Sequence, residues 1–342
     1  MQEYSFELPF PSRVSQAMES AAVHHFRWVQ EHGLLGQESL PEYRRWNVPE
    51  VAARFWPHAG GADLELGIDI AGWFILVDDQ FDGPLGVEPH RVTRIVQELI
   101  DVVYARPGAV PAVPKKSLTP AASGLISLWS RQVRGMSAAW QQRSTRNWED
   151  FLNAYTSESN NRRNGIIPDV STYLSLRHKA GLENVLIDYA ERIGHYEVPD
   201  ALFALPEIQE MHNATVQVVN IVQDVFSVAK EEARGDCHNL VLVLQHHRNY
   251  SRGEALAEAR SIVRGHTDEF LRLKARLPAL FDAAALPPHD RGIAYVFVDD
   301  LQAQMKGCHD WCRSSSRYSR VIRARPDEPT YLEEMRLEGL GR

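Results

Sequence analysis

The chain has 342 residues, of which 44% are hydrophobic and 24% are charged. These proportions are ordinary for a globular protein with a large core, and they exclude disorder over most of the chain. Thirty-seven Lys and Arg against 45 Asp and Glu leave a net charge of −8. Nucleic acids and anionic membrane surfaces need a basic face on their partner, so neither is an expected ligand.

Three cysteines in so long a chain are too few for a disulfide framework. The N-terminal residues MQEYSFELPFPSRVS carry acidic side chains where a signal peptide carries basic ones. No apolar run approaches the roughly 20 residues that a membrane span needs. We therefore expect a cytoplasmic protein that forms no stable association with membranes.

Long stretches with apolar residues at helical spacing alternate with a few turn-rich segments. These segments cover residues 8–12, 83–89, 106–120, 164–169 and 285–292. Hairpin turns between alternating strands are missing, so the pattern predicts an all-α protein of about ten or eleven helices. No shift in composition marks a boundary. We therefore expect one helical domain over residues 1–342, with its core at about 10–319 and a candidate flexible tail at 320–342.

The first unusual segment in chain order, residues 71–83, reads AGWFILVDDQFDG. On a helix, Asp78 and Asp82 share one side, and Asp79 is adjacent to Asp82. Like charges at these spacings repel one another, and the negative end of the helix dipole adds to the repulsion. A solvated acidic helix end is the structural alternative. A divalent cation would resolve the repulsion, and Mg²⁺ prefers such hard oxygen ligands.

A second polar face lies within residues 211–232, MHNATVQVVNIVQDVFSVAKEE. Gln223, Ser227 and Glu231 follow at four-residue steps, so they share one face of a helix over two turns. Their amide, hydroxyl and carboxylate oxygens form another set suited to Mg²⁺, and Lys230 beside them can reach a phosphate. Asp224 is off this face and is expected to pair within its own helix. The structural alternative is the polar side of an amphipathic helix.

The clearest helix signal follows at residues 251–277. Ser251 can cap the helix, and Glu254 stands three residues later, as in a capping box.

Taken together, the two oxygen-rich faces indicate more than either does alone. Basic residues flank them in a chain that is otherwise acidic. Metal ions would let this chain bind a polyanion that its net charge repels. The two faces therefore predict a diphosphate bridged by magnesium.

These residues resemble the motifs of the bacterial class I terpene synthase family. Residues 78–82, DDQFD, match its aspartate-rich motif DDxxD. Residues 223–231, QDVFSVAKE, resemble its second metal motif NDxxSxxxE, with Gln223 in place of the usual Asn. The longer side chain puts direct metal binding at this position in question. Asn220 is a conceivable substitute, but it would form a poorer triad with the residues that follow it.

Two further features are similar to that family, and the resemblance extends from about Phe10 to Ser319. Arg177 stands at the family's spacing before the second motif and matches its pyrophosphate-sensing arginine. By the same comparison, Gly181 falls at the effector carbonyl and Ala180 at the linker position. Arg317 and Tyr318 resemble the terminal Arg-Tyr pair that binds diphosphate.

The resemblance implies a single-domain class I terpenoid synthase bundle around an apolar cavity. Asp78 and Asp82 would bind Mg²⁺, and Asp79 would contact neighbouring groups. Gln223, Ser227 and Glu231 would bind another ion. The resemblance implies three Mg²⁺ ions in total when diphosphate is bound. Arg177, Lys230, Arg317 and Tyr318 would hold the diphosphate, and the carbonyl of Gly181 would assist proton steps. Aromatic faces stabilise carbocations, and the candidates for the cavity wall are Trp56, Trp73, Phe74, Phe81 and Trp311.

The implied reaction is Mg²⁺-dependent ionisation of an isoprenyl diphosphate, followed by cyclisation or rearrangement to a terpene hydrocarbon or alcohol. Farnesyl diphosphate is favoured, and geranylgeranyl and geranyl diphosphate are the alternatives. Chain-elongating isoprenyl synthases carry two aspartate-rich motifs, and this sequence has one. A helical binding protein that has lost catalysis is a further alternative, supported by Gln223 alone. The chain is expected to act as a monomer or a homodimer.

Overall fold

The computed structural model describes residues 5–105 and 118–319 of the chain. Within these ranges it has fifteen α-helices, one short 3₁₀-helix and no strand. The helices are α1 (Met18–Glu31), α2 (Leu40–Trp46), α3 (Val48–Phe55), α4 (Gly61–Phe81), η2 (Pro84–Val87), α5 (Pro89–Tyr104), α6 (Pro120–Gln132), α7 (Ala138–Asn164), α8 (Val170–Ala180), α9 (Glu183–Gly194), α10 (Asp200–Phe203), α11 (Pro206–Arg234), α12 (Leu240–Arg248), α13 (Arg252–Ala283), α14 (Pro288–Ser314) and α15 (Ser316–Ser319).

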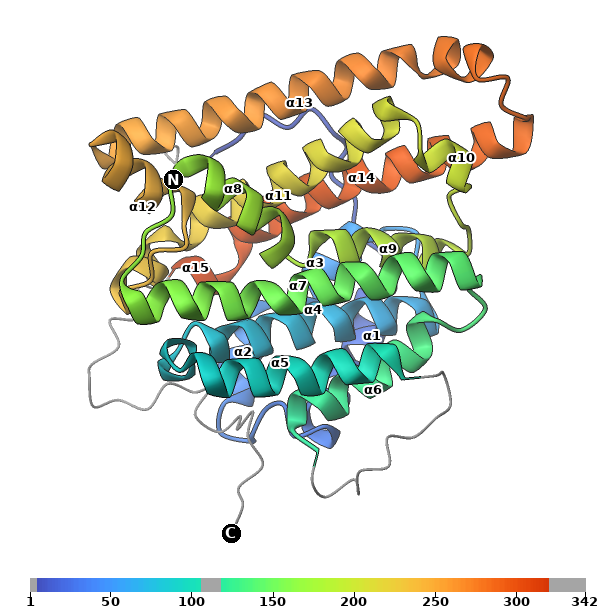
Figure 1. The fold of residues 1–342 in the computed structure, drawn as a ribbon. Coiled ribbons are helices and arrows are strands. Elements are labelled where there is room, and N and C mark those ends of the chain that lie inside the picture. The colour runs from blue at the N-terminus through green and yellow to red at the C-terminus, as the bar shows by residue number, and fades with distance from the viewer. Residues whose placement is uncertain (1–4, 106–117, 320–342) are drawn as a thin grey trace.

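The helices form a layered bundle in which α4 and α11 lie inside (Figure 1). The long helix α13 covers one side and packs on α11, which also packs on α14. On the other side α5 and α6 pack against each other, and α5 also packs on α7. α4 packs against α1, α3 and α6. One hydrophobic cluster extends through these layers.

α4 is a buried helix because it is apolar on nearly every side. All residues from Leu66 to Val77 are buried, including the run Trp73–Val77. A helix that is hydrophobic all round is stable only inside a protein. Its last turn therefore places the three aspartates at the edge of the core. Among the described residues, no helix has both the length and the apolar character needed to cross a membrane.

The all-α prediction is confirmed, and the described chain has more helices than expected. The additional elements are short, such as α10 and α15 with four residues each. Such pieces are too short for a periodic pattern, so the sequence does not separate them from loops. The predicted turn at 285–292 is partly wrong, because α14 begins at Pro288. Proline is favoured in the first helical turn, where its missing N–H is no loss.

The capping box predicted at Ser251 and Glu254 is present, and α13 continues to Ala283. This helix therefore extends past the predicted end at Leu277, and Pro278 lies inside it. Most of the predicted loop at 106–120 and the whole tail at 320–342 lie outside the described residues.

Candidate active site

One cavity opens into the bundle beside the C-terminal end of α4 and the C-terminal half of α11. α3, α7, α8, α9, α14 and α15 complete its wall. Its lining residues are Val51, Phe55, Ala71, Phe74, Ile75, Asp78, Asp82, Glu158, Arg162, Arg177, Ala180, Leu186, Gln223, Ser227, Lys230, Glu231, Asp236, His238, Trp311, Arg317 and Tyr318.

One face of α4 changes from apolar to acidic along this cavity. Ala71, Phe74 and Ile75 line it first, and Asp78 and Asp82 follow at helical spacing. The side chain of Asp78 receives one hydrogen bond, from the hydroxyl of Tyr155 at 3.2 Å. Burial and the nearby Asp82 carboxylate raise the pKa of Asp78 to about 7. The negative charge of Asp78 is therefore poorly compensated by the protein itself.

Asp79 is turned away from the cavity and is bound by three basic side chains. Lys230 and Arg234 of α11 contact its Oδ1 at 2.7 and 3.0 Å, and Arg317 of α15 contacts its Oδ2 at 2.6 Å. Burial alone would raise the pKa of this carboxyl, but Arg317, Lys230 and Arg234 outweigh burial and hold it well below its usual range. Asp79 thus joins the end of α4 to α11 and α15.

The predicted polar face of α11 borders the same cavity. Gln223, Ser227, Lys230 and Glu231 all line the cavity. Glu231 receives a hydrogen bond from Nδ2 of Asn239 at 2.6 Å. Burial, followed by the nearby Asp224, raises the pKa of Glu231 to about 8. Like Asp78, Glu231 is a half-buried acid that forms no ion pair with the described residues.

Asp224 is off this face, as predicted, but its expected pairing within α11 is wrong. Its carboxylate accepts hydrogen bonds from the Nε of Arg177 at 3.0 Å, from the hydroxyl of Tyr173, and from the backbone N–H of Leu240 at 3.0 Å. Both side chains come from α8, which packs on α11. Sequence spacing did not indicate this contact, because it joins helices that are about 50 residues apart in the chain.

The break between α8 and α9 lies beside α11. Leu182 adopts φ 60° there, and a Cβ added at Gly181 would lie 1.8 Å from Oδ1 of Asn220. Asn220 is fully buried and donates from Nδ2 to the carbonyl of Arg177 at 2.9 Å. Asn220 therefore holds the helix break and is no substitute for Gln223 in the cavity. Gly181 is not among the lining residues, whereas its neighbour Ala180 is.

Arg317 and Tyr318 lie where α15 closes the cavity. The guanidinium of Arg317 stacks over the ring of Trp46 at 4.7 Å, and its side chain also contacts Asp79. Tyr318 packs edge-on against Trp311, with 5.6 Å between the ring centroids. The C-terminal end of the described chain thus completes the cavity.

Four titratable lining residues were missed by the sequence interpretation: Glu158, Arg162, Asp236 and His238. Arg162 donates to Oδ1 of Asp82 at 3.0 Å and to Oδ2 of Asp236 at 2.6 Å. It therefore connects the aspartate-rich end of α4 to the loop that follows α11. Arg162 and Glu158 are one turn apart on α7, but a polar face on a long helix is too common to signal a site.

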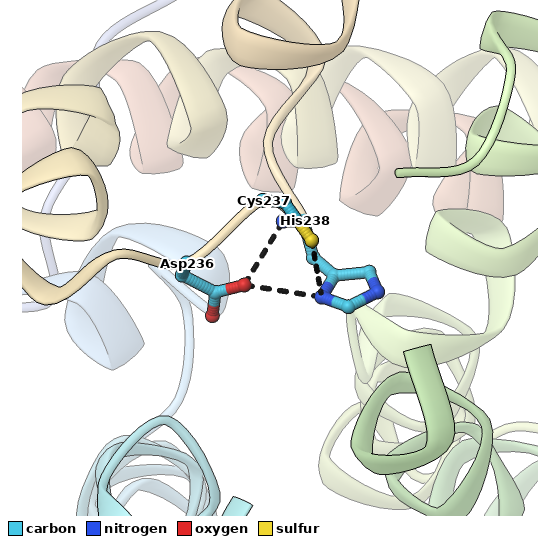
Figure 2. A group of neighbouring side chains, drawn as sticks. All are labelled: Asp236, Cys237 and His238. Carbon is cyan, nitrogen blue, oxygen red and sulfur yellow. Dashed lines mark hydrogen bonds and ion pairs between the residues drawn. The ribbon is translucent and has the colours of Figure 1, made fainter. Parts of the chain in front are cut away.

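Asp236, Cys237 and His238 lie together in the loop after α11 (Figure 2). Oδ1 of Asp236 accepts from the backbone N–H of His238 at 2.9 Å and lies 3.0 Å from its Nδ1. Burial lowers the pKa of His238, but the hydrogen bond to Asp236 outweighs burial and raises this pKa to about 10. Arg162 binds the other oxygen of Asp236, so Asp236 and His238 belong with Arg162 to a charge network that lines the cavity.

Two of the five predicted cavity aromatics, Phe74 and Trp311, line the cavity. The placement of the other three is corrected. Trp73 donates to the carbonyl of Ala121 at 2.9 Å, and Phe81 stacks on Tyr155 with 4.1 Å between the centroids. The ring of Trp56 packs against Gly67 and Tyr189 in the core. Composition cannot tell which face of a buried helix an aromatic ring occupies.

Comparison with known proteins identifies the class to which this site belongs. Residues 69–269 match the family model described as terpene synthase family 2, C-terminal metal binding. The chain therefore belongs to the bacterial class I terpene synthases, which makes it a carbon–oxygen lyase that acts on prenyl diphosphates. The matched region includes both acidic motifs and Arg177.

Individual relatives are similar over almost the whole chain. Pentalenene synthase of Streptomyces avermitilis is 35% identical over 337 residues, which cover 98% of each chain. R-linalool synthase of Streptomyces clavuligerus is 34% identical over 320 residues, which cover 93% of this chain and 94% of that one. The crystal structure of linalool/nerolidol synthase from Streptomyces clavuligerus superposes with a TM-score of 0.81 at 32% identity, covering 90% of this chain and 100% of the other.

Proposed function

We propose that the chain, as a single helical domain, catalyses the Mg²⁺-dependent ionisation of farnesyl diphosphate and the conversion of the resulting cation to a terpene. One observation carries the proposal. Two helices contribute oxygen ligands to one cavity, and the cations Arg177, Lys230 and Arg317 line the same cavity. A leaving diphosphate needs this combination of metal ligands and cations.

The donor set fits magnesium. Asp78 on α4, Asp82 directly after it, and Ser227 and Glu231 on α11 offer only oxygen atoms to the cavity, which is the chemistry that Mg²⁺ prefers. Arg162 donates to Oδ1 of Asp82, so this residue would bind an ion through its Oδ2. Asp78 and Glu231 are also half-buried acids with raised pKa values, so a bound cation would supply the positive charge that their surroundings lack. Bound Mg²⁺ would stabilise the negative charge that develops on the diphosphate oxygens.

Gln223 lies on the same face of α11, but its amide oxygen accepts a hydrogen bond from Arg177 at 3.3 Å. Gln223 is therefore not assigned as a ligand of Mg²⁺. Asp79 is likewise excluded as a ligand, because three basic side chains occupy its two oxygens.

The basic residues of this chain would hold the leaving group. Arg177, Lys230 and Arg317 come from three different helices, and Tyr318 adds a hydroxyl donor. Donors that are already in place stabilise the departing anion without reorganising during the reaction. Ionisation of the allylic carbon–oxygen bond leaves a carbocation in the apolar part of the cavity. Phe74 and Trp311 would face this cation with their rings and exclude water from it.

The choice of farnesyl diphosphate is supported by the named relatives. A relative from Saccharothrix espanaensis, 32% identical over 338 residues, is named for cyclising (2E,6E)-farnesyl diphosphate to (−)-β-caryophyllene. A relative from Streptomyces viridochromogenes, 32% identical over 324 residues, is named for cyclising the same substrate to 7-epi-α-eudesmol.

The test is incubation of the purified chain with geranyl, farnesyl and geranylgeranyl diphosphate, each with Mg²⁺ or with EDTA. Mass analysis of a hexane extract would identify the product, and a diphosphate-release assay would measure ionisation independently. A volatile terpene from farnesyl diphosphate that requires Mg²⁺ is expected. The Ser227→Ala variant is the matched control, because it removes one oxygen ligand at the cavity wall. Absence of product and of diphosphate release with all three substrates would contradict the proposal.

A further inference from the structure

Arg177 is held by two consecutive residues of α11. Its Nε donates to Oδ1 of Asp224 at 3.0 Å, and its Nη2 donates to Oε1 of Gln223 at 3.3 Å. Asp224 is almost fully buried and accepts two further hydrogen bonds, from Tyr173 and Leu240, so it is a fixed anchor. Gln223 differs from Asp224 because it lines the cavity. The two contacts together fix both the position and the rotation of the guanidinium plane.

The amide oxygen of Gln223 cannot serve Arg177 and a metal ion equally well. Coordination of Mg²⁺ by an oxygen that already accepts from a guanidinium would bring two positive charges onto one atom. Mg²⁺ also demands near-ideal octahedral geometry and readily keeps water as a ligand. The hydrogen bond to Arg177 and the coordination of an ion are therefore competing uses of Gln223, and the structure shows the first of them.

Among the neighbouring polar residues of α11, Asn220, Ser227 and Glu231 do not orient the Arg177 guanidinium. Asn220 is buried at the helix break and donates to the carbonyl of Arg177, so it orients the backbone of Arg177 and not its guanidinium. Ser227 donates to the carbonyl of Asp224 at 3.4 Å, and Glu231 accepts from Asn239 at 2.6 Å. An asparagine at position 223 would hold its amide oxygen one methylene closer to the backbone, which withdraws it from Nη2 of Arg177.

We propose that Gln223 is a positioning residue that aims the Arg177 guanidinium at the substrate diphosphate, and that it is not a ligand of Mg²⁺. Ser227 and Glu231 would then be the residues of α11 that hold the ion. This inference rests on the proposed function, because it takes Arg177 to be a diphosphate-binding residue.

A double-mutant cycle on binding of inorganic diphosphate tests the inference without using catalysis. Calorimetric titrations at saturating Mg²⁺ would compare the wild-type chain, Gln223→Leu, Arg177→Ala and the double variant. Loss of a hydrogen bond to a charged group should weaken diphosphate binding by about tenfold in Gln223→Leu. Because Gln223 acts through Arg177, the same substitution should change binding less than twofold in the Arg177→Ala background.

A second titration separates positioning from metal binding. At fixed diphosphate, the half-saturating Mg²⁺ concentration should stay within about twofold of wild type in Gln223→Leu and should rise about tenfold or more in the control Ser227→Ala. Gln223→Asn should keep the Mg²⁺ requirement of wild type and bind diphosphate as weakly as Gln223→Leu. Thermal unfolding of each variant would verify that the fold is retained.

Three outcomes would overturn the inference. Additive losses in the cycle would show that Gln223 acts independently of Arg177. A large rise in the Mg²⁺ requirement of Gln223→Leu, cured by Gln223→Asn, would show that residue 223 is a metal ligand. Both outcomes leave the proposed function intact. A wild-type chain that binds no diphosphate with Mg²⁺ would instead contradict the proposed function, and the inference with it.

Discussion

The end of α4 and the C-terminal half of α11 are both acidic and face one cavity, yet their charges are compensated differently. At the end of α4, three basic side chains surround Asp79, while Asp78 receives one neutral hydrogen bond from Tyr155. On α11, Asp224 is bound by Arg177 and Tyr173, while Glu231 receives one neutral hydrogen bond from Asn239.

Basic side chains therefore compensate the carboxylates of Asp79, Asp82 and Asp224, whereas Asp78 and Glu231 form no ion pair with the described residues. The cations around Asp79 come from α11 and α15, so this carboxylate joins the two walls of the cavity. The side-chain partners of Asp224 come from α8 and tie the cavity-lining Arg177 to α11. The comparison teaches that adjacent acids in a motif have opposite roles, and that the partner of each acid decides which role it has.

The largest effect is expected from Asp78→Asn, which removes an uncompensated acid. Ionisation of farnesyl diphosphate should slow by about 10³-fold or more, because metal-assisted charge stabilisation at the leaving group is lost. Stability in EDTA should not fall, since the variant relieves the burial of a charge. Steady-state kinetics and thermal unfolding with EDTA would measure the two effects. A clear loss of stability would contradict the stated difference between Asp78 and Asp79.

Asp79→Asn, in contrast, is expected to lower the stability of the metal-free protein. Breaking a buried ion pair by removing one partner leaves uncompensated charge, here on Lys230, Arg234 and Arg317. The free energy of unfolding in EDTA should fall by about 3 kcal/mol. Urea unfolding would measure this loss, and Asp78→Asn is the matched control at the adjacent position. Equal stability of the two variants would show that the three basic contacts add nothing to the fold.

Glu183 is a fully buried acid that lies outside the cavity lining. Burial raises its pKa to about 8 from the usual 4.5, and neither of its carboxylate oxygens has a hydrogen-bond partner in the described structure. Between pH 4.5 and about 8 the unfolded chain releases this proton and the folded chain keeps it. Stability should therefore fall as pH rises through this window, by up to about 1.4 kcal/mol per pH unit, and level off above it.

Glu183→Gln should remove this part of the pH dependence, which urea unfolding at several pH values would measure. Glu258→Gln, at an exposed position of α13, is the control and should leave the slope unchanged. Saturation with Mg²⁺ and diphosphate should not remove the Glu183 contribution, because this residue does not face the cavity. If stability depends on pH equally in wild type and Glu183→Gln, Glu183 is not the source of this pH dependence.

The smallest effect is expected from two Tyr→Phe variants, one in each region. Tyr155→Phe removes the hydroxyl that donates to Asp78, and Tyr173→Phe removes the one that donates to Asp224. Loss of either hydrogen bond should cost about 1 kcal/mol of free energy. In Tyr155→Phe it should raise the half-saturating Mg²⁺ concentration about fivefold. In Tyr173→Phe it should lower stability and leave the Mg²⁺ requirement unchanged. Interchanged effects would contradict the two roles.

Local features of the chain were readable because helices have a fixed period. The four-residue spacing of Gln223, Ser227 and Glu231 placed these side chains on one face, and the structure has them on one cavity wall. The charges that end the apolar run at Val77 placed the aspartates at the end of a buried helix. The capping box at Ser251 located the start of α13. In each case the signal and the structure lie within a few turns of the same helix.

The sequence by itself thus determined the all-α class, the two acidic faces and, through the family motifs, the kind of reaction. Only the tertiary structure decided that Arg162 joins Asp82 to Asp236, that Asp224 binds Arg177, and which aromatic rings reach the cavity. The reason is physical. Periodicity sets the face of a single helix, whereas these contacts join helices far apart in the chain and depend on how those helices pack.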